Sequence, residues 1–193
     1  MDALEIRPVG PDDLPLIEQL FGPRGACAGC WCMWWRAEKG GKDWKAAQGP
    51  VNRARFQALV EAGRVHGLLA FDGAEPVGWC DLAPYGDYGR LARARKLQRL
   101  NRGATWSIPC FFIKRGYRKQ GVASRLLGAA VEHAWTLGAG EIEGYPVGAG
   151  PVGGGPAVDT FAYTGLPSMF EAAGFRQVPS TDQGSRTIYL KTR

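Results

Sequence analysis

A strand, a basic turn and a long helix follow one another within residues 106–137, and this unit constrains the fold more than any other stretch. The first eight residues are largely β-branched or aromatic, which predicts a buried strand. After a basic turn at residues 114–119, apolar residues recur at helical spacing from about residue 120. They include Val122, Leu126, Ala130 and Ala134. This spacing predicts a helix with a broad apolar face.

The junction between this strand and this helix has the properties of an anion site. Backbone N–H groups in the first turn of a helix have no intrahelical partner, and the helix dipole adds partial positive charge there. Gly121 lets a ligand approach the backbone because it lacks a Cβ atom, and Ala123 is nearly as small. Arg118 and Lys119 add full positive charges. The junction therefore predicts a bound phosphate or pyrophosphate, although its spacing matches neither a Walker loop nor a dinucleotide fingerprint.

Two segments resemble one enzyme family. Residues 118–123 read Arg-Lys-Gln-Gly-Val-Ala, which is similar to the Arg/Gln-x-x-Gly-x-Gly/Ala turn of the GNAT N-acetyltransferases. Residues 168–175 resemble the closing helix and turn of that family. The resemblance implies an α+β fold, a mixed and mostly antiparallel sheet of about six to seven strands with a splayed parallel central pair, flanked by about four helices. It also implies that residues 1–193 form a single acetyl-CoA-dependent acyltransferase domain.

The resemblance implies direct transfer of an acetyl group from acetyl-CoA to a primary amine. The pantetheine arm would pair with the open edge of the strand at residues 110–113, next to a parallel strand at residues 142–145. The N–H near Ile113 could donate to the carbonyl oxygen as it becomes an oxyanion. The expected coenzyme-binding residues are Phe111, Phe112, Ile113, Arg118, Lys119, Gln120, Gly121, Val122, Ala123 and Ser124.

The catalytic groups depart from the family pattern. Many members carry a glutamate on the central strand as general base, but residues 106–110 contain no carboxylate. Asp81, acting through water, or a water chain alone remains as the base. Members commonly place a tyrosine four residues before the closing glycine, and Phe170 occupies that position here. Tyr163 or Tyr145 could instead protonate the leaving thiolate. Cys110 is less favoured as a covalent nucleophile, because no histidine lies near it in sequence and a buried thiol is usually inert.

A cluster of cysteines and tryptophans lies between the first two predicted helices. Its members are Cys27, Cys30, Cys32, Trp31, Trp34 and Trp35. Zinc needs about four Cys or His ligands, so these three cysteines make at most part of a site, and a loop with small buried thiols is favoured. No metal is therefore expected. In the resembled fold this region walls the acceptor pocket, so the tryptophans are interpreted as pocket lining, with core packing as the alternative.

The remaining chain alternates strands and helices. We expect strands at residues 4–9, 65–71, 76–82, 141–147, 175–178 and 187–190. We expect further helices at residues 14–21, 51–62 and 163–173. The low-complexity stretch at residues 148–159 is expected to be a mobile loop at the rim of the site.

The formal net charge of +6 could come from residues 90–102 alone, which hold six basic residues and no acid. A solvated helical face is the favoured interpretation of this stretch, and a lid that attracts coenzyme phosphates or an acidic acceptor is the alternative. Because the rest of the chain is nearly neutral, a general nucleic-acid surface is not implied.

Composition limits location and partners. No run of about 18 apolar residues is present, so no membrane partner is expected, and the start of the chain has no signal pattern. The odd number of cysteines, five, favours a reducing cytoplasm. The expected partners are acetyl-CoA and a small amine, amino acid or drug-like acceptor, and a homodimer stays open. The alternatives are a CoA-binding sensor without catalysis and, ranked lower, a zinc or nucleic-acid-binding module.

Overall fold

One mixed β-sheet runs through the part of the chain that the computed structural model describes, residues 4–37, 44–147, 162–180 and 187–193. Its seven strands in these residues follow the order β1–β2–β3–β4–β5–β7–β6. They are β1 (Glu5–Pro8), β2 (Leu68–Asp72), β3 (Glu75–Pro84), β4 (Thr105–Ile113), β5 (Glu141–Gly144), β6 (Arg176–Val178) and β7 (Ile188–Thr192). Only β4 and β5 pair in parallel; the other paired strands are antiparallel. The predicted sheet architecture is confirmed.

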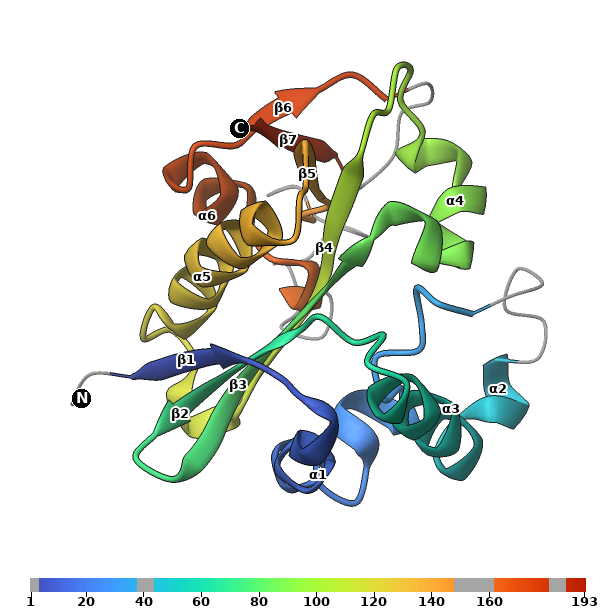
Figure 1. Cartoon of the computed structure of the whole chain (residues 1–193), viewed down its shortest axis with the longest axis vertical. Coiled ribbons are helices and arrows are strands. Elements are labelled where there is room, and N and C mark those ends of the chain that lie inside the picture. Colours follow the sequence, from blue (N-terminus) through green and yellow to red (C-terminus); the bar gives the residue numbers. More distant parts are fainter. Residues whose placement is uncertain (1–3, 38–43, 148–161, 181–186) are drawn as a thin grey trace, which may run out of the picture.

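Helices cover both faces of this sheet (Figure 1). They are α1 (Leu14–Phe21), α2 (Trp44–Ala47), α3 (Pro50–Glu61), α4 (Gly89–Arg93), α5 (Val122–Thr136) and α6 (Pro167–Ala172). In Figure 1, α5 and α6 lie on one side of the central strands, and α1, α2, α3 and α4 lie on the other. The described residues thus contain six α-helices rather than about four, because α2 and α4 are single short turns of four and five residues.

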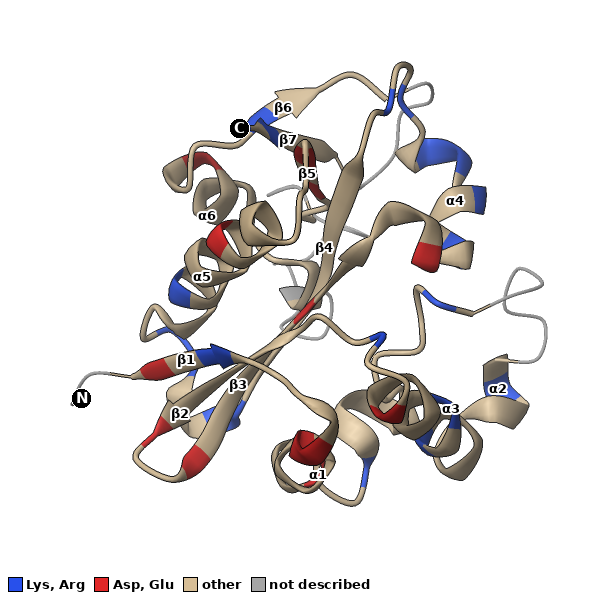
Figure 2. Ribbon diagram, in the orientation of Figure 1, with Lys and Arg blue, Asp and Glu red and all other residues tan. Residues whose placement is uncertain are grey.

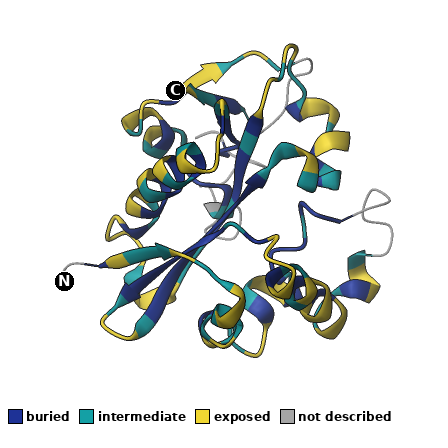
Figure 3. Ribbon diagram, in the orientation of Figure 1, coloured by how far each residue is buried: buried dark blue, intermediate teal, exposed yellow. Residues whose placement is uncertain are grey.

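Alternating side chains divide the core between the two faces. Leu68 and Ala70 of β2 pack into the cluster beneath α5, whereas Leu69 and Phe71 pack with α1 and α3. This alternation is the period of a strand that is buried on both faces. Figure 3 shows the result, with β2, β3 and much of β4 buried between exposed outer helix faces. The apolar face predicted for α5 is confirmed, since its regularly spaced residues are all buried.

Two elements are shorter than the sequence pattern predicts: one helix is divided and one strand ends early. The helix expected at residues 163–173 is divided into a 3-10 turn, Ala162–Thr164, and α6. Gly165 has φ +85° between them, and Pro167 then begins α6 at a position where its missing N–H costs no hydrogen bond. The strand expected at residues 141–147 stops as β5 at Gly144. The glycine-rich stretch at residues 148–159 lies outside the described residues.

The parallel pair separates halfway along β4, and this positions the site. β5 pairs with β4 only from Thr105 opposite Glu141 to Ile108 opposite Gly144. β4 then continues to Ile113 while still paired with β3 on its other side. Within the described residues, no strand pairs with residues 109–113 on the β5 side. This half of β4 therefore carries an open edge, which leads directly into the turn before α5.

The described helices include none with the length and apolar character needed to cross a membrane.

Candidate functional site

The start of α5 presents uncapped amides to solvent. Gly121 precedes the helix with φ +78°, in the left-handed region that favours glycine, and no side chain caps this helix end. The first-turn N–H groups of Val122, Ala123 and Ser124 therefore lack intrahelical acceptors. A Cβ atom on Gly121 would meet nothing within 4 Å, so the space in front of it is open. Whether an anion binds here, as the sequence predicts, stays a prediction.

The basic turn is tied to the open edge of β4. The Nε of Arg118 donates to the backbone oxygen of Ile113, the last residue of β4, at 3.1 Å. Lys119 has φ +60°, which reverses the chain sharply before the helix. The open strand edge and the helix N-terminus are consequently adjacent.

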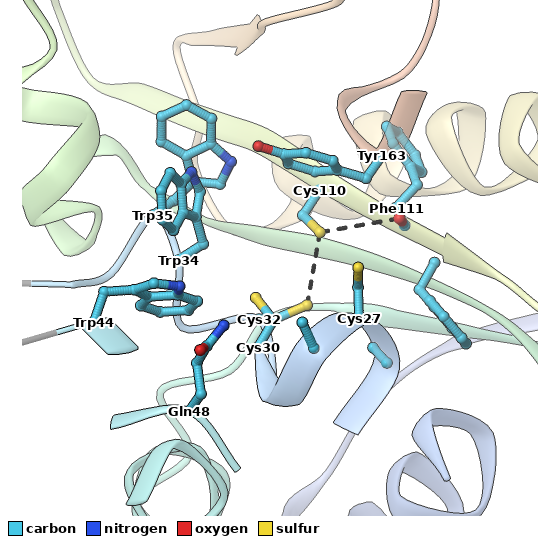
Figure 4. Close-up of a pocket in the computed structure, with 13 residues that line it drawn as sticks. Cys27, Cys30, Cys32, Trp34, Trp35, Trp44, Gln48, Cys110, Phe111 and Tyr163 are labelled. Atoms are coloured by element: carbon cyan, nitrogen blue, oxygen red, sulfur yellow. Dashed lines mark hydrogen bonds between the residues drawn. The ribbon is translucent and has the colours of Figure 1, made fainter. Parts of the chain in front are cut away.

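An apolar cavity lies on the face of the sheet opposite α5, beside the outer half of β4 (Figure 4). Its volume is about 230 Å³. The described residues that line it are Ala26, Cys27, Ala28, Cys30, Cys32, Trp34, Trp35, Trp44, Gln48, Cys110, Phe111, Phe112 and Tyr163. None of them carries a formal charge at neutral pH unless a thiol ionises. The volume lies below the roughly 300–1,000 Å³ of pockets for drug-sized ligands, so the cavity suits a small molecule.

The predicted pocket tryptophans occupy different places. Trp34 and Trp35 line the cavity, whereas Trp31 packs in the core, with its ring centroid 5.8 Å from that of Phe21. Trp44 and Gln48 also line the cavity, and no periodic pattern in the sequence could place them there. Trp44 packs edge-on against Trp34 at 5.0 Å between centroids.

Two thiols of the cavity, Cys30 and Cys110, favour their neutral form. Burial is the main cause that raises the pKa of Cys30 to about 12. A hydrogen bond from Cys32 lowers the pKa of Cys110, but burial and nearby Cys30 and Asp81 together raise it above its ordinary value. Since the thiolate is the nucleophile and the metal ligand, these thiols are poorly suited to either role. The described residues contain no group of three or more His, Cys, Asp or Glu that could hold a metal ion.

The loop that forms one wall of the cavity has a constrained backbone. Four non-glycine residues in it adopt positive φ: Ala26, Ala28, Trp31 and Cys32. Such residues cost of order 1–3 kcal/mol each and persist where the surroundings enforce them. Hydrogen bonds to Gly29 help to hold this loop in place. The Gly29 oxygen accepts from the Gly49 N–H at 3.0 Å and from Asn52 Nδ2 at 3.2 Å.

We expect Gly29→Ala to destabilise the fold clearly more than Gly22→Ala. Both positions have positive φ, +70° and +65°. A Cβ atom at Gly29 would lie 2.3 Å from the Gly49 nitrogen, whereas one at Gly22 would meet nothing within 4 Å. Gly22 has ψ −175°, a backbone region that is essentially restricted to glycine, so Gly22→Ala should cost about 1–3 kcal/mol from backbone strain alone. Gly29→Ala should cost at least about 2 kcal/mol more. Urea unfolding measures the stability of both variants. Equal losses of stability would show that the close contact between the Gly29 and Gly49 backbones does not restrict position 29.

Asp81 lies on β3 directly opposite Cys110 of β4 and is fully buried. Its Oδ1 accepts from the Nη2 of Arg36 at 3.1 Å, and the other oxygen has no partner within the described residues. Burial lowers the pKa of Arg36, but the charge of Asp81 and the nearby Tyr88 outweigh it and raise the pKa above its ordinary value. Asp81 is thus the carboxylate of a buried ion pair, and it is not among the residues that line the cavity.

The two candidate tyrosines differ in environment. Tyr163 lines the cavity beside Cys110 and Phe111 (Figure 4). Tyr145 is fully buried; its hydroxyl donates to Glu143 at 2.7 Å and is 2.8 Å from the Ser107 hydroxyl. Burial and the charge of Glu143 raise the pKa of Tyr145 well above its ordinary value. The geometry favours Tyr163 of the two as a group that could meet a ligand.

The basic stretch at residues 90–102 is only partly a solvated face. Arg99 bonds Glu141 and Glu143, and Arg102 bonds Glu143 at 3.0 Å. Glu143 is fully buried and Arg99 is 8% exposed, so these charges are neutralised inside the protein. Figure 2 shows the basic residues of this stretch on and around α4 and in the loop that leads into β4. For Arg99 and Arg102, both the solvated-face and the lid interpretations are wrong, because the stretch contributes two ion-paired side chains to the core.

Comparison with known proteins assigns the family. The model of the acetyltransferase (GNAT) family matches residues 30–144. That match spans more than half of the chain. The chain belongs to the GNAT family. No curated protein matches this GNAT chain in sequence.

Solved structures share the GNAT fold across nearly the whole chain. A PaiA N-acetyltransferase from Thermoplasma acidophilum, solved with coenzyme A, has a TM-score of 0.54 and 16% identity and covers 99% of both chains. YncA, a putative acetyltransferase from Salmonella typhimurium solved with acetyl-CoA, has a TM-score of 0.56 and 11% identity, covering 99% of this chain and 94% of its own. A ribosomal-protein-alanine N-acetyltransferase from Brucella melitensis has a TM-score of 0.57 and 13% identity, covering 98% and 99%. At these identities the likeness shows the fold alone.

Proposed function

We propose that this chain transfers an acetyl group from acetyl-CoA to the primary amine of a small acceptor by direct attack, and that residues 1–193 form one acyltransferase domain. One observation carries the proposal: the open half of β4 connects an uncapped helix N-terminus on one side with an apolar cavity on the other. A diphosphate suits the first site and a small uncharged amine suits the second. The thioester would then lie between them, at the edge of β4.

The coenzyme would use backbone groups for most of its contacts. Its diphosphate would accept from the N–H groups of Gly121 to Ser124, with Arg118, Lys119 and Gln120 around it. Its pantetheine arm would add to the edge formed by Phe111, Phe112 and Ile113, as an extra strand does. PaiA and YncA, which share the fold, were solved with coenzyme A and acetyl-CoA, and this supports the assignment.

The reaction step needs a neutral amine and a place for its proton. The amine nitrogen attacks the thioester carbonyl carbon, the carbonyl oxygen takes negative charge, and the carbon–sulfur bond then breaks to give an amide and the coenzyme thiolate. Asp81 could accept the amine proton through water at its unpartnered oxygen. Tyr163 lines the cavity and could return a proton to the thiolate. Tyr145 is less suited, because its hydroxyl is committed to Glu143.

The test measures free coenzyme thiol released from acetyl-CoA across a panel of small primary amines. We expect amine-dependent release by the wild-type protein. For Tyr163→Phe we expect turnover to fall by about 10²-fold, the lower end for loss of a general acid, with little change in the KM for acetyl-CoA.

Two results would separate the parts of this proposal. Absence of thiol release with every amine, together with normal coenzyme binding, would leave no support for catalysis. Release that is unchanged in Tyr163→Phe would remove Tyr163 from the mechanism without affecting the assignment of the reaction.

A CoA-binding sensor without catalysis is the second candidate. Two observations favour it: β4 carries no carboxylate, and Phe170 is fully buried between Phe111 and Phe175 where the family commonly has a tyrosine. A sensor would bind coenzyme A and acetyl-CoA and release no thiol.

A further inference from the structure

Arg90 is fixed against the outer wall of the cavity. Its guanidinium carbon lies 3.5 Å from the ring centroid of Trp34, and its backbone N–H donates to the oxygen of Trp35 at 3.0 Å. Both tryptophans line the cavity. Arg90 is not itself among the residues that line the cavity, so its side chain and backbone hold this cation against a cavity wall rather than inside the cavity.

Within the described residues Arg90 has no acidic partner, and in this it differs from Arg99 and Arg102. Arg99 and Arg102 bond carboxylates, and Arg93 donates to the oxygen of Ala37 at 3.0 Å. Among the described residues, no carboxylate forms an ion pair with Arg90 or influences its charge. Burial lowers the pKa of Arg90, while the nearby hydroxyl of Tyr163, another cavity residue, raises it. The guanidinium stays protonated at neutral pH.

The stacked geometry leaves the donors of Arg90 available. A guanidinium that lies over an aromatic ring uses its face for the ring, and its N–H groups point outward in its own plane. That planar arrangement matches the two oxygens of a carboxylate, which arginine binds through two parallel hydrogen bonds. A half-buried cation without a counter-ion is also stabilised when an anion arrives.

The position of Arg90 relative to β4 sets where the anion would lie on the acceptor. Figure 4 shows Trp34 and Trp44 on the opposite side of the cavity from Phe111, which lies on the open edge of β4. The thioester is placed at that edge by the proposed function. The amine of the acceptor would therefore point towards Phe111, and the other end of the molecule would reach Trp34.

From this arrangement we infer that the acceptor is a primary amine with an apolar body and a carboxylate at the end remote from the amine, and that Arg90 recognises that carboxylate. The cavity supplies aromatic rings for the body and no charge of its own. The inference rests on the proposed function for the direction of the acceptor, whereas the role of Arg90 is a binding property that is measurable without turnover.

Calorimetry with two matched amines tests this. The protein is saturated with coenzyme A and titrated with 4-(aminomethyl)benzoate and with benzylamine, which differ only in the carboxylate. We expect the benzoate to bind at least about tenfold more tightly to the wild-type protein, since a hydrogen-bonded charge pair is involved. In Arg90→Ala the ratio of the two dissociation constants should fall to about one. Lys96→Ala removes an exposed cation from the same stretch and should leave the ratio unchanged.

The outcomes distinguish this inference from the proposed function. A carboxylate preference that disappears in Arg90→Ala supports the inference even if no thiol is ever released, in which case the enzymatic proposal alone fails. Equal binding of the two amines to the wild-type protein, no binding of either, or a preference that survives Arg90→Ala overturns it. An equal loss in Lys96→Ala would also overturn it, because the effect would then come from net charge.

Discussion

Ser124→Glu should strongly weaken coenzyme binding while leaving the fold slightly more stable. Ser124 is exposed in the first turn of α5, where a carboxylate interacts favourably with the helix dipole by about 0.3–1 kcal/mol. The same carboxylate would occupy the anion site and repel the diphosphate. Two unit charges 4 Å apart near a protein surface interact by about 4 kcal/mol, so the dissociation constant for acetyl-CoA should rise by at least about 100-fold, or 2.7 kcal/mol.

Gly128→Glu is the matched control for this experiment. Gly128 lies four residues further along α5, is exposed, and has nothing within 4 Å of an added Cβ atom. The Gly128→Glu variant adds the same charge to the same helix, away from the uncapped amides. Calorimetry measures the affinity of both variants for acetyl-CoA, and thermal unfolding measures their stability. If Ser124→Glu binds acetyl-CoA as tightly as Gly128→Glu does, the diphosphate does not bind at this helix end.

Arg36→Met should produce the largest loss of stability among single changes near the cavity. Arg36 and Asp81 are 3% and 0% exposed, so removal of the cation leaves a buried carboxylate without compensation. Breaking such a pair from one side costs about 3–5 kcal/mol, against a total stability of about 5–15 kcal/mol for a typical protein. Arg36 also stacks on Tyr88 at 4.7 Å, and that contact is lost too. Guanidinium unfolding measures the change.

The double variant Arg36→Met with Asp81→Leu separates stability from catalysis. Replacing both members of a buried pair by apolar side chains is often close to neutral, so the double variant should recover most of the lost stability. If Asp81 accepts the amine proton, the recovered protein should still lack turnover. A cost below about 1 kcal/mol for Arg36→Met would show that this pair contributes little to the fold, and full turnover in the double variant would exclude Asp81 as the base.

The elements around residues 106–137 were predictable because local and long-range signals agree there. The apolar period of α5 matches its burial, and the β-branched and aromatic run of β4 matches a strand in the middle of the sheet. Boundaries were less predictable where a single residue overrides a pattern, as Gly165 does when it divides the expected helix. The family turn was recognisable because Gly121 and the residues around it are contiguous in sequence.

The cavity was only partly predictable because its walls come from distant segments. Trp34 and Trp35 were expected to line a pocket because of their place in the resembled fold, but Trp44, Gln48 and Cys110 reach the same space only through the fold. Buried ion pairs were missed for the same reason. A run of basic residues gives no sign of its partners, and Arg99 meets Glu143 across 44 positions of sequence.

The separation of β4 from β5 has a consequence beyond catalysis. A strand edge with unpaired N–H and C=O groups is a template on which another polypeptide can add, and proteins usually protect such edges. In the proposed complex the cosubstrate itself covers residues 110–113, as a non-peptide replacement for a missing strand. Ligand supply would then govern resistance to self-association as well as turnover, because a molecule that binds only the folded state stabilises it in proportion to the logarithm of its concentration.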